Sequence, residues 1–536
     1  MIAFRLFMVP MILVALIGAS LGPTRGQALA QGVLHRGNDG DPRTLDPHQS
    51  TTVAEAHLLR DLSAGLVIHN MRGEVVPGVA ESWTTSEDGK TWRFVLRETA
   101  RWSNGDPVTA ADFVASFRRA LDPRRGAPSA ALLYPILNAE KLHKGAGGTN
   151  PADLGVSAPA PLQLEITLER PAPYLLELLT HPAGLPVHRS MMERFGRSGA
   201  GPEAMVTNGP YTLREFVPSS HIRLDRNPAF HDAANVAIET VISYPSSDSA
   251  IAARRFQAGE LHLTTDIPAD QIQALRAKLG PQVKIAPGLG TYFLVLNTAK
   301  APFDDTRVRR ALSLAIDREF LAERIWSGAM LPAYGVIPPG IGHYGERAEL
   351  DFKMASPLER EDEARRLLSA AGFAPGVPLR LELRYNRSDD NRRTILAIAE
   401  QWKAIGVETS LFETDSASHF AHLREGGDFD VARYGWIADY SDPQNVLFLF
   451  QSDTHGFNFG RFSDPQFDRL MALAAAQPDL AERAAILREA DSIIAREQPW
   501  IPVLHYTTRN LVSPKLTGFA PNPHGAIPSR FLSLRP

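Results

Sequence analysis

Short apolar runs alternate with polar positions through the first part of the chain, and Gly, Pro and Asp turns separate them. The segment Thr91–Leu96 alternates as a half-buried strand does, and 164–168 repeats the pattern. Between them the sequence predicts a helix with Thr109 as its N-cap and Asp112 three residues further on. The Gly-, Ala- and Pro-rich segment 145–161 is expected to be a surface loop.

The hydrophobic period changes in the middle of the chain. Residues 188–287 mix short strands, such as 238–244, with a modest helix predicted over 269–278. Beyond Gly290 stronger amphipathic helices alternate with strands. This change predicts a boundary between structural units close to Gly290.

Helix signals are strong in the second half. Thr306 is predicted to cap one helix. Ser356 and Glu359 form a capping box with a proline at the first helical position, and Gly372 is expected to end that helix. A last helix is predicted over 480–496, before a proline.

A βαβ unit is predicted over 379–412. Leu379–Tyr385 alternates as a strand, a helix with buried Ile395, Ile398 and Trp402 follows, and a second strand starts after Gly406. The crossover is expected to be right-handed. Such units place ligands beyond the carboxyl ends of their strands.

The stretch 428–443 begins as a strand and then combines opposite charges with aromatic residues. Gly435 frees its backbone, and unpaired Arg433 and Asp439 would be costly among apolar neighbours. Either the two charges pair with each other or with core groups, or they await a ligand of both signs, such as a peptide. Spacing alone does not decide. The aromatic residues are Tyr434, Trp436 and Tyr440.

Composition narrows the function. The 536 residues suffice for two or three domains, and a formal charge of -4 makes neither nucleic acid nor an anionic membrane the expected partner. With 44% hydrophobic and 22% charged residues, the chain has the composition of a soluble globular protein. It has no cysteine, which excludes disulfides, thiol catalysis, thiolate metal sites and a lipid-modified N-terminal cysteine.

The first residues are typical of an export signal. A basic start precedes an apolar run broken by Pro10, and Ala28-Leu29-Ala30 is a small-x-small cleavage motif before Gln31. Residues 1–30 are therefore predicted to be a signal peptide. The mature chain is expected to be unlipidated and to reside in the periplasm of a Gram-negative cell.

Enzyme signatures are absent from the sequence. There is no Gly-x-Ser-x-Gly, His-Glu-x-x-His or Walker loop. Gly288-Leu-Gly lacks the third glycine of a dinucleotide loop and is expected to be a strand-entry turn. His419 and His422 lie one helical turn apart, but without a third ligand they are expected to be surface histidines. No catalytic residue, metal or cofactor is predicted.

Long segments resemble, in order, the periplasmic oligopeptide-binding proteins of ABC importers, within family 5 of the extracellular solute-binding proteins. The resemblance spans the mature chain. It implies an α/β, two-lobed, type II periplasmic-binding-protein clamp with an extra third domain, hinged around an extended peptide. The segments that carry it are 88–97, 101–113, 207–213, 308–312, 332–335, 385–389 and 429–440.

The resemblance also implies domains and partners. One domain would combine 31–63, 188–289 and 507–536, an extra domain would span 64–187, and the second lobe would span 290–506. The protein would be a monomer that delivers oligopeptides to permease and ATPase subunits. It would catalyse no reaction and bind no nucleic acid.

The resemblance assigns roles to particular residues. Asp439 would grip the peptide's α-ammonium, Arg433 would meet its carboxylate in ligands of suitable length, and Trp436 would wall a side-chain pocket. Tyr134 would contact the peptide backbone. The expected ligand-binding residues are Tyr134, Arg433, Gly435, Trp436, Asp439 and Tyr440.

The chain departs from the family at several positions. Ser313 and Asn391 replace a lysine and a histidine linked to the ligand's C-terminus, and a pocket tryptophan is missing near Ala417. Gly290 and Ile437 occupy the positions of two bridging cysteines. Peptide length therefore stays open, and so do a non-peptide solute (murein peptide derivative, opine, nickel chelate or sugar) and a periplasmic hydrolase.

Overall fold

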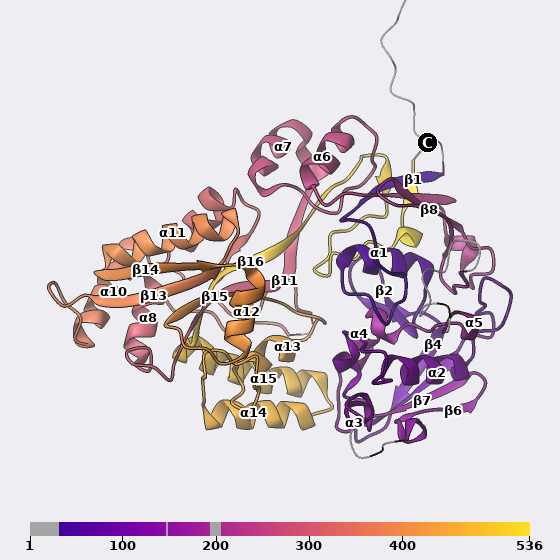
Figure 1. The fold of residues 1–536 in the computed structure, drawn as a ribbon, viewed down its shortest axis with the longest axis horizontal. Helices are drawn as coiled ribbons and strands as arrows, with labels where there is room; N and C mark the ends of the chain where they lie inside the picture. The colour runs from indigo at the N-terminus through magenta and orange to yellow at the C-terminus, as the bar shows by residue number, and fades with distance from the viewer. Residues whose placement is uncertain are drawn as a thin grey trace, which may run out of the picture.

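The computed structural model describes residues 32–145, 148, 150–192, 194, 205–342 and 344–535. The predicted signal peptide and its cleavage site lie outside these residues. Figure 1 shows two lobes connected by the two longest strands, β11 (Val283–Leu296) and β16 (Trp500–Leu511). No helix in the described part of the chain has the length and apolar character needed to cross a membrane.

The first lobe, which carries β1 to β10 and the C-terminal segment, contains two four-stranded sheets. One has the order β1-β10-β9-β8, with β1 parallel to β10 and the other pairs antiparallel. The strand expected over 238–244 is β10. The bounds are β1 (Val33–Asn38), β8 (Tyr211–Val217), β9 (His221–Arg226), β10 (Thr240–Pro245), α1 (Val53–Leu62) and α5 (Arg189–Met192).

The other sheet has the antiparallel order β4-β5-β7-β6. β5 (Thr91–Leu96) alternates buried and exposed residues as predicted, and α2 (Ala110–Ala120) has the predicted capping box between Thr109 and Asp112. The remaining elements of this region are β2 (Val67–His69), β3 (Val75–Pro77), β4 (Ala80–Thr85), α3 (Ala139–His143), β6 (Val156–Ala160), β7 (Gln163–Thr167) and α4 (Leu175–Leu179).

The predicted loop over 145–161 is wrong at its end, where β6 forms. β6 is an edge strand whose backbone pairs with β7, so its small side chains do not decide its conformation. Pro159 cannot donate to a ladder, but an edge strand tolerates that loss.

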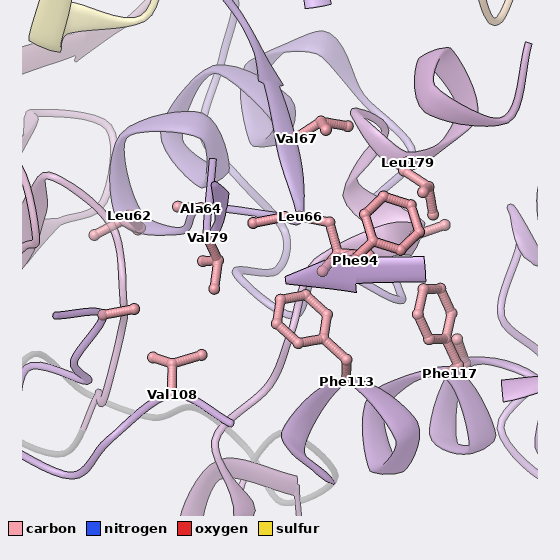
Figure 2. Close-up of a cluster of buried hydrophobic side chains, with 14 of the residues drawn as sticks. Leu62, Ala64, Leu66, Val67, Val79, Phe94, Val108, Phe113, Phe117 and Leu179 are labelled. Atoms are coloured by element: carbon pink, nitrogen blue, oxygen red, sulfur yellow. The ribbon is translucent and has the colours of Figure 1, made fainter. Parts of the chain in front are cut away.

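Figure 2 shows how α2 packs on this sheet: Phe113 and Phe117 reach toward Phe94 of β5. Burying each phenylalanine contributes about 1.5–3 kcal/mol. The same buried cluster continues to Leu34 and Leu224 of the β1-β10-β9-β8 sheet. The two sheets of the first lobe therefore share one core.

The second lobe is built on a six-stranded sheet with the order β12-β16-β11-β15-β13-β14. The predicted βαβ unit is confirmed, because β13 (Leu379–Asn386) and β14 (Val407–Thr414) are parallel and α11 (Asp389–Ala404) connects them. β15 (Val431–Ile437) pairs antiparallel with β11 and parallel with β13. It therefore lies inside the sheet, next to the carboxyl end of β13.

Helices cover both faces of this sheet. Buried residues of α8, α10 and α11 form one core, and those of α12 to α15 form another. The further bounds are α8 (Thr306–Leu314), α9 (Arg318–Phe320), β12 (Leu331–Pro332), α10 (Pro357–Ala370), α12 (Ser416–Arg424), α13 (Gln444–Leu447), α14 (Pro465–Ala476) and α15 (Leu480–Glu497).

The helix signals of this lobe are mostly confirmed. α10 has its capping box between Ser356 and Glu359, and Gly372 follows it with φ +96°. α8, however, is capped by Asp305, whose carboxylate accepts from the backbone N–H of Arg307. Thr306 is instead the first helical residue.

The connection between the lobes contains a change of register. In the β11–β16 pair, Pro287 lies opposite Thr507, whereas Thr291 lies opposite His505. Gly288 therefore lies inside a strand and not in the expected strand-entry turn. α6 (Ser249–Gln257) and α7 (Ile272–Leu279) lie beside this connection, and α7 follows a 3-10 turn over 269–271 within the helix predicted there. β17 (Leu516–Thr517) and β18 (Ser533–Leu534) close the chain.

Candidate functional site

Arg433, on β15, is held by neutral side chains. Its Nη1 donates to Asn386 Oδ1 at 3.1 Å and its Nη2 donates to the Tyr506 hydroxyl at 2.9 Å. Its guanidinium carbon lies 4.5 Å from the centre of the Tyr292 ring. No carboxylate in the described part of the chain lies within ion-pair distance of Arg433, so its charge is not neutralised by an acid.

Gly435 leaves space for that arrangement. A Cβ at this position would lie 2.5 Å from the Tyr506 hydroxyl and 3.3 Å from Arg433 Nη2. The first distance is shorter than real Cβ contacts, so a side chain would push Tyr506 away from Arg433. The structure thus brings Arg433 and Gly435 together through Tyr506.

Asn391 lies in the same network. Its amide nitrogen donates to the Asn386 backbone oxygen at 3.0 Å and to Asn386 Oδ1 at 3.2 Å. Asn386 therefore connects Asn391 to Arg433 without any charge. Ser313 lies elsewhere, because it is fully buried and its hydroxyl accepts from Arg318.

The two histidines of α12 each contact a backbone oxygen. His419 is buried, and its Nε2 lies 2.8 Å from the Arg433 backbone oxygen. Burial lowers the pKa of His419 to about 4, so the ring is neutral at neutral pH. His422 contacts the Asp428 backbone oxygen. The expectation of a surface histidine is wrong for His419, which supports the strand that carries Arg433.

Asn445 organises the residues after β15. Trp436 Nε1 donates to the Asn445 backbone oxygen at 2.7 Å, and the Asp439 N–H donates to Asn445 Oδ1 at 3.0 Å. The Trp436 ring packs edge-on against Phe448 and Phe457, with centroids 5.6 and 6.0 Å apart. These contacts fix the Trp436 ring, and Asn445 connects that ring to the backbone of Asp439.

Asp439 has no ion pair in the described part of the chain. It is exposed, yet the protein around it raises the pKa of its carboxyl, an effect partly offset by a hydrogen bond from the Asn445 side chain. The alternative in which Arg433 pairs with Asp439 is wrong, whereas the hydrogen bonds of Arg433 to Asn386 and Tyr506 fit the alternative of pairing with core groups. Two opposite charges therefore lie on β15 and its following turn, and neither has an ionic partner.

Tyr440 joins this turn to the first lobe. Its ring stacks on Tyr174, with centroids 5.1 Å and planes 11° apart. Beside them Arg483 and Asp442 form an ion pair at 2.6 Å with side chains only 3% and 8% exposed, and Arg483 lies 5.2 Å from the Tyr174 ring centre. Burial raises the pKa of Tyr440 well above its usual value, so the hydroxyl stays protonated.

A pocket of about 560 Å³ opens between the lobes at this contact. Tyr134 lines it from the first lobe, and its hydroxyl lies 2.7 Å from His143 Nδ1. Tyr134 is thus the one expected ligand-binding residue among the described residues that line this pocket, which do not include Arg433 or Asp439. The lining residues include Tyr134, Glu169, Tyr174, Gln444, Asp468 and Arg483.

Sequence reasoning missed several partners of these residues. Asn386 ends β13, so the rule for carboxyl ends of parallel strands could have identified it. Tyr506 and Asn445 carry no local signal, because only the tertiary fold brings them to Arg433 and Asp439. Gly290 lies directly opposite Ile437 in the β11–β15 pair, as expected for the two bridging positions.

Comparisons with known proteins agree over most of the chain. The periplasmic oligopeptide-binding protein OppA of Salmonella typhimurium is 37% identical over 521 residues, 95% of this chain and 94% of that protein. The probable deoxycholate-binding periplasmic protein YgiS of Escherichia coli is 34% identical over 535 residues, 99% of this chain and 98% of that protein.

The solved structures identify the fold. The unliganded open form of the periplasmic murein tripeptide-binding protein MppA matches with a TM-score of 0.86 and 34% identity, over 94% of this chain and 97% of that one. The fold is therefore α/β and two-lobed, that of a type II periplasmic binding protein with an extra domain. Residues 74–458 match the description "Bacterial extracellular solute-binding proteins, family 5 Middle". The chain belongs to family 5 of the bacterial extracellular solute-binding proteins.

Proposed function

We propose that this protein is the peptide-binding component of an ABC importer. It captures oligopeptides between its lobes and delivers them to a membrane permease driven by ATPase subunits. Full-length similarity to a periplasmic oligopeptide-binding protein supports this function. Solute-binding proteins of this family bind their ligands and do not catalyse reactions, so the hydrolase alternative is set aside.

One observation carries the proposal: Arg433 and Asp439 bear opposite charges close in sequence, and neither has an ionic partner among the described residues. An unpaired ion in a closing cleft costs several kcal/mol. A peptide supplies both missing charges, its α-ammonium for Asp439 and its carboxylate for Arg433.

The remaining expected residues would form the rest of the cleft. Trp436 and its aromatic neighbours would wall a side-chain pocket, while Tyr134 would approach the peptide from the first lobe and Tyr440 from the second. Hydrogen bonds to the peptide main chain, with water in the side-chain pockets, would allow one protein to accept many sequences.

We assign the lobe motion to the β11–β16 connection. The change of register between Pro287 and Thr291 supports a hinge there and a boundary at 289/290. The proposed domains are 31–63 with 188–289 and 507–536, 64–187, and 290–506. We further propose a monomer, exported to the periplasm by residues 1–30 and not lipidated.

A non-peptide solute is the second candidate, because YgiS is named as a probable deoxycholate-binding protein. A bile acid carries a carboxylate but no ammonium. It would use Arg433 and leave Asp439 without a partner, so the two candidates differ in their need for Asp439.

Calorimetry with a free and an N-acetylated version of one peptide tests the proposal. Wild type should bind the free peptide and fail to bind the acetylated one. Asp439→Asn should lose about a hundredfold to a thousandfold in affinity for the free peptide, because a buried ammonium loses its charge partner. Asp428→Asn, which changes a carboxylate 72% exposed on the same stretch, should bind as wild type does.

Binding of the peptide should also weaken at both low and high pH. Because the pKa of Asp439 is raised, acid protonates it early and weakens binding. Above roughly pH 8 the peptide's α-amino group loses its proton, which again weakens binding. If the acetylated peptide binds wild type as tightly as the free one, the ammonium site is wrong and the non-peptide candidate takes its place.

A further inference from the structure

A second group of chemically active side chains lies in the first lobe, away from β15. His69 at the end of β2, Glu177 in α4 and His524 in the C-terminal segment bring one ligand atom each to within 4.8 Å of one another. His69 Nε2 lies 3.1 Å from Glu177 Oε2. The rings of His69 and His524 have centroids 4.0 Å apart with planes inclined by 34°.

The protein encloses these groups. The side chains of His69 and Glu177 are only 5% and 12% exposed, and His524 is half-buried. The nearby Arg60 adds a positive charge that opposes a cation, and the Glu177 carboxylate offsets it.

The nitrogen of His69 that faces Glu177 is Nε2, so an ion would take the place of the proton that these two side chains share. His69 Nδ1 lies on the other side of the ring, where it is buried without a hydrogen-bond partner in the described part of the chain. Nδ1 would therefore carry the ring proton when Nε2 binds a metal.

We propose that His69, Glu177 and His524 bind one divalent cation, with Zn²⁺ as the best match to their chemistry. Two imidazoles and one carboxylate suit Zn²⁺, which takes nitrogen and carboxylate oxygen at about 2.0–2.2 Å. Ligands of a tetrahedral ion at these lengths lie about 3.3 Å apart, close to the 3.1 Å between His69 and Glu177.

The fourth side of the cluster is polar. The Thr180 hydroxyl lies 3.4 Å from His69 Nε2 and donates its proton to the Glu177 backbone oxygen, so its lone pairs are available to a water on the ion.

The ion would join three segments that are distant in sequence. Residue 524 follows Pro523, which lies so close to Gly340 that a Cβ there would be 2.5 Å from the Pro523 Cβ and 2.7 Å from the Gly288 oxygen. Gly288 lies within the change of register that connects the lobes. The proposed site thus braces the first lobe beside that connection, independently of any peptide.

Titration of chelator-treated, tag-free full-length protein with ZnCl₂ tests the site. Calorimetry should show one saturable ion per chain, and Zn²⁺ but not Mg²⁺ should raise the melting temperature. His524→Ala and Glu177→Gln should each lose at least about tenfold in affinity, because loss of a supporting residue alone costs that much.

His221→Ala is the matched control. His221 also lies 3.2 Å from a glutamate, Glu215, but on the surface and without a third ligand in the described part of the chain. The His221→Ala variant should bind Zn²⁺ as wild type does. Circular dichroism identifies any variant that fails to fold, and the visible spectrum of wild type loaded with Co²⁺ then reports nitrogen and oxygen ligation directly. Absence of saturable binding by wild type, or unchanged binding by folded His524→Ala, would overturn the proposal.

Discussion

At the scale of single residues, Arg433 differs from an ordinary buried arginine because its partners carry no negative charge. Asn386, Tyr506 and Tyr292 orient the guanidinium and leave its charge available. An acid from outside would gain a charge-assisted hydrogen bond there, and such bonds are roughly twice as strong as neutral ones.

Arg433→Ala should therefore weaken binding of free-acid peptides by roughly tenfold to a hundredfold, and binding of their C-terminal amides much less. Calorimetry on matched acid and amide peptides measures the difference. Comparing two ligands on one variant removes any effect on stability. Arg380→Ala, an arginine 73% exposed on the same sheet, should change neither affinity. Equal losses for acid and amide would mean that Arg433 only supports the sheet.

At the scale of elements, the capping box of α10 allows the contribution of a local sequence signal to stability to be measured. Ser356 accepts from the Glu359 N–H, and the Glu359 carboxylate accepts from the Ser356 N–H, so two end groups are satisfied by side chains.

Ser356→Ala should lower the free energy of unfolding by about 1 kcal/mol, because one capping bond is lost. Denaturant unfolding monitored by circular dichroism measures it. Ser369, in the last turn of the same helix, is exposed and outside the cap, so Ser369→Ala should leave stability unchanged or raise it slightly. A loss as large in Ser369→Ala would show that the cap is not the cause.

Elements of this kind could be predicted because their causes lie within a few residues. β5, the cap of α2 and the β13–α11–β14 unit all follow from alternation, capping and hydrophobic period. β6 could not be predicted, because it forms by pairing with β7 at the edge of the sheet. Nothing in the composition of β6 indicates this pairing.

The same division applies to the candidate site. One stretch of sequence supplied Arg433, Trp436 and Asp439, because opposite charges beside aromatic residues are locally visible. Their partners are tertiary: Tyr506 reaches Arg433 from a strand 73 residues further on. The burial of His419 was missed for the same reason, since its partner is a backbone oxygen of another element.

At the scale of the whole molecule, the arrangement of lobes matches an unliganded open form with a TM-score of 0.86. Tyr174 and Tyr440 nevertheless already stack across the lobes, so the two are held near each other before any ligand arrives. The proposed closure would then be a rotation that brings Tyr134 and its neighbours toward the β15 turn.

Saturating peptide should therefore reduce the radius of gyration in small-angle scattering. It should also raise the melting temperature with ligand concentration, because the ligand binds only the folded form. The Asp439→Asn variant at the same peptide concentration serves as the control and should show neither change. A scattering profile that stays the same for wild type at saturation would argue against a clamp.

The β11–β16 pair has a further consequence for communication. Two hydrogen-bonded strands that cross together would resist sliding more than bending, so the proposed hinge would change mainly the angle between the lobes. The angle would then depend on whether a peptide is bound and not on the sequence of that peptide. A membrane permease that recognises this angle would need no contact with the peptide's side chains. One permease could therefore accept ligands of many sequences.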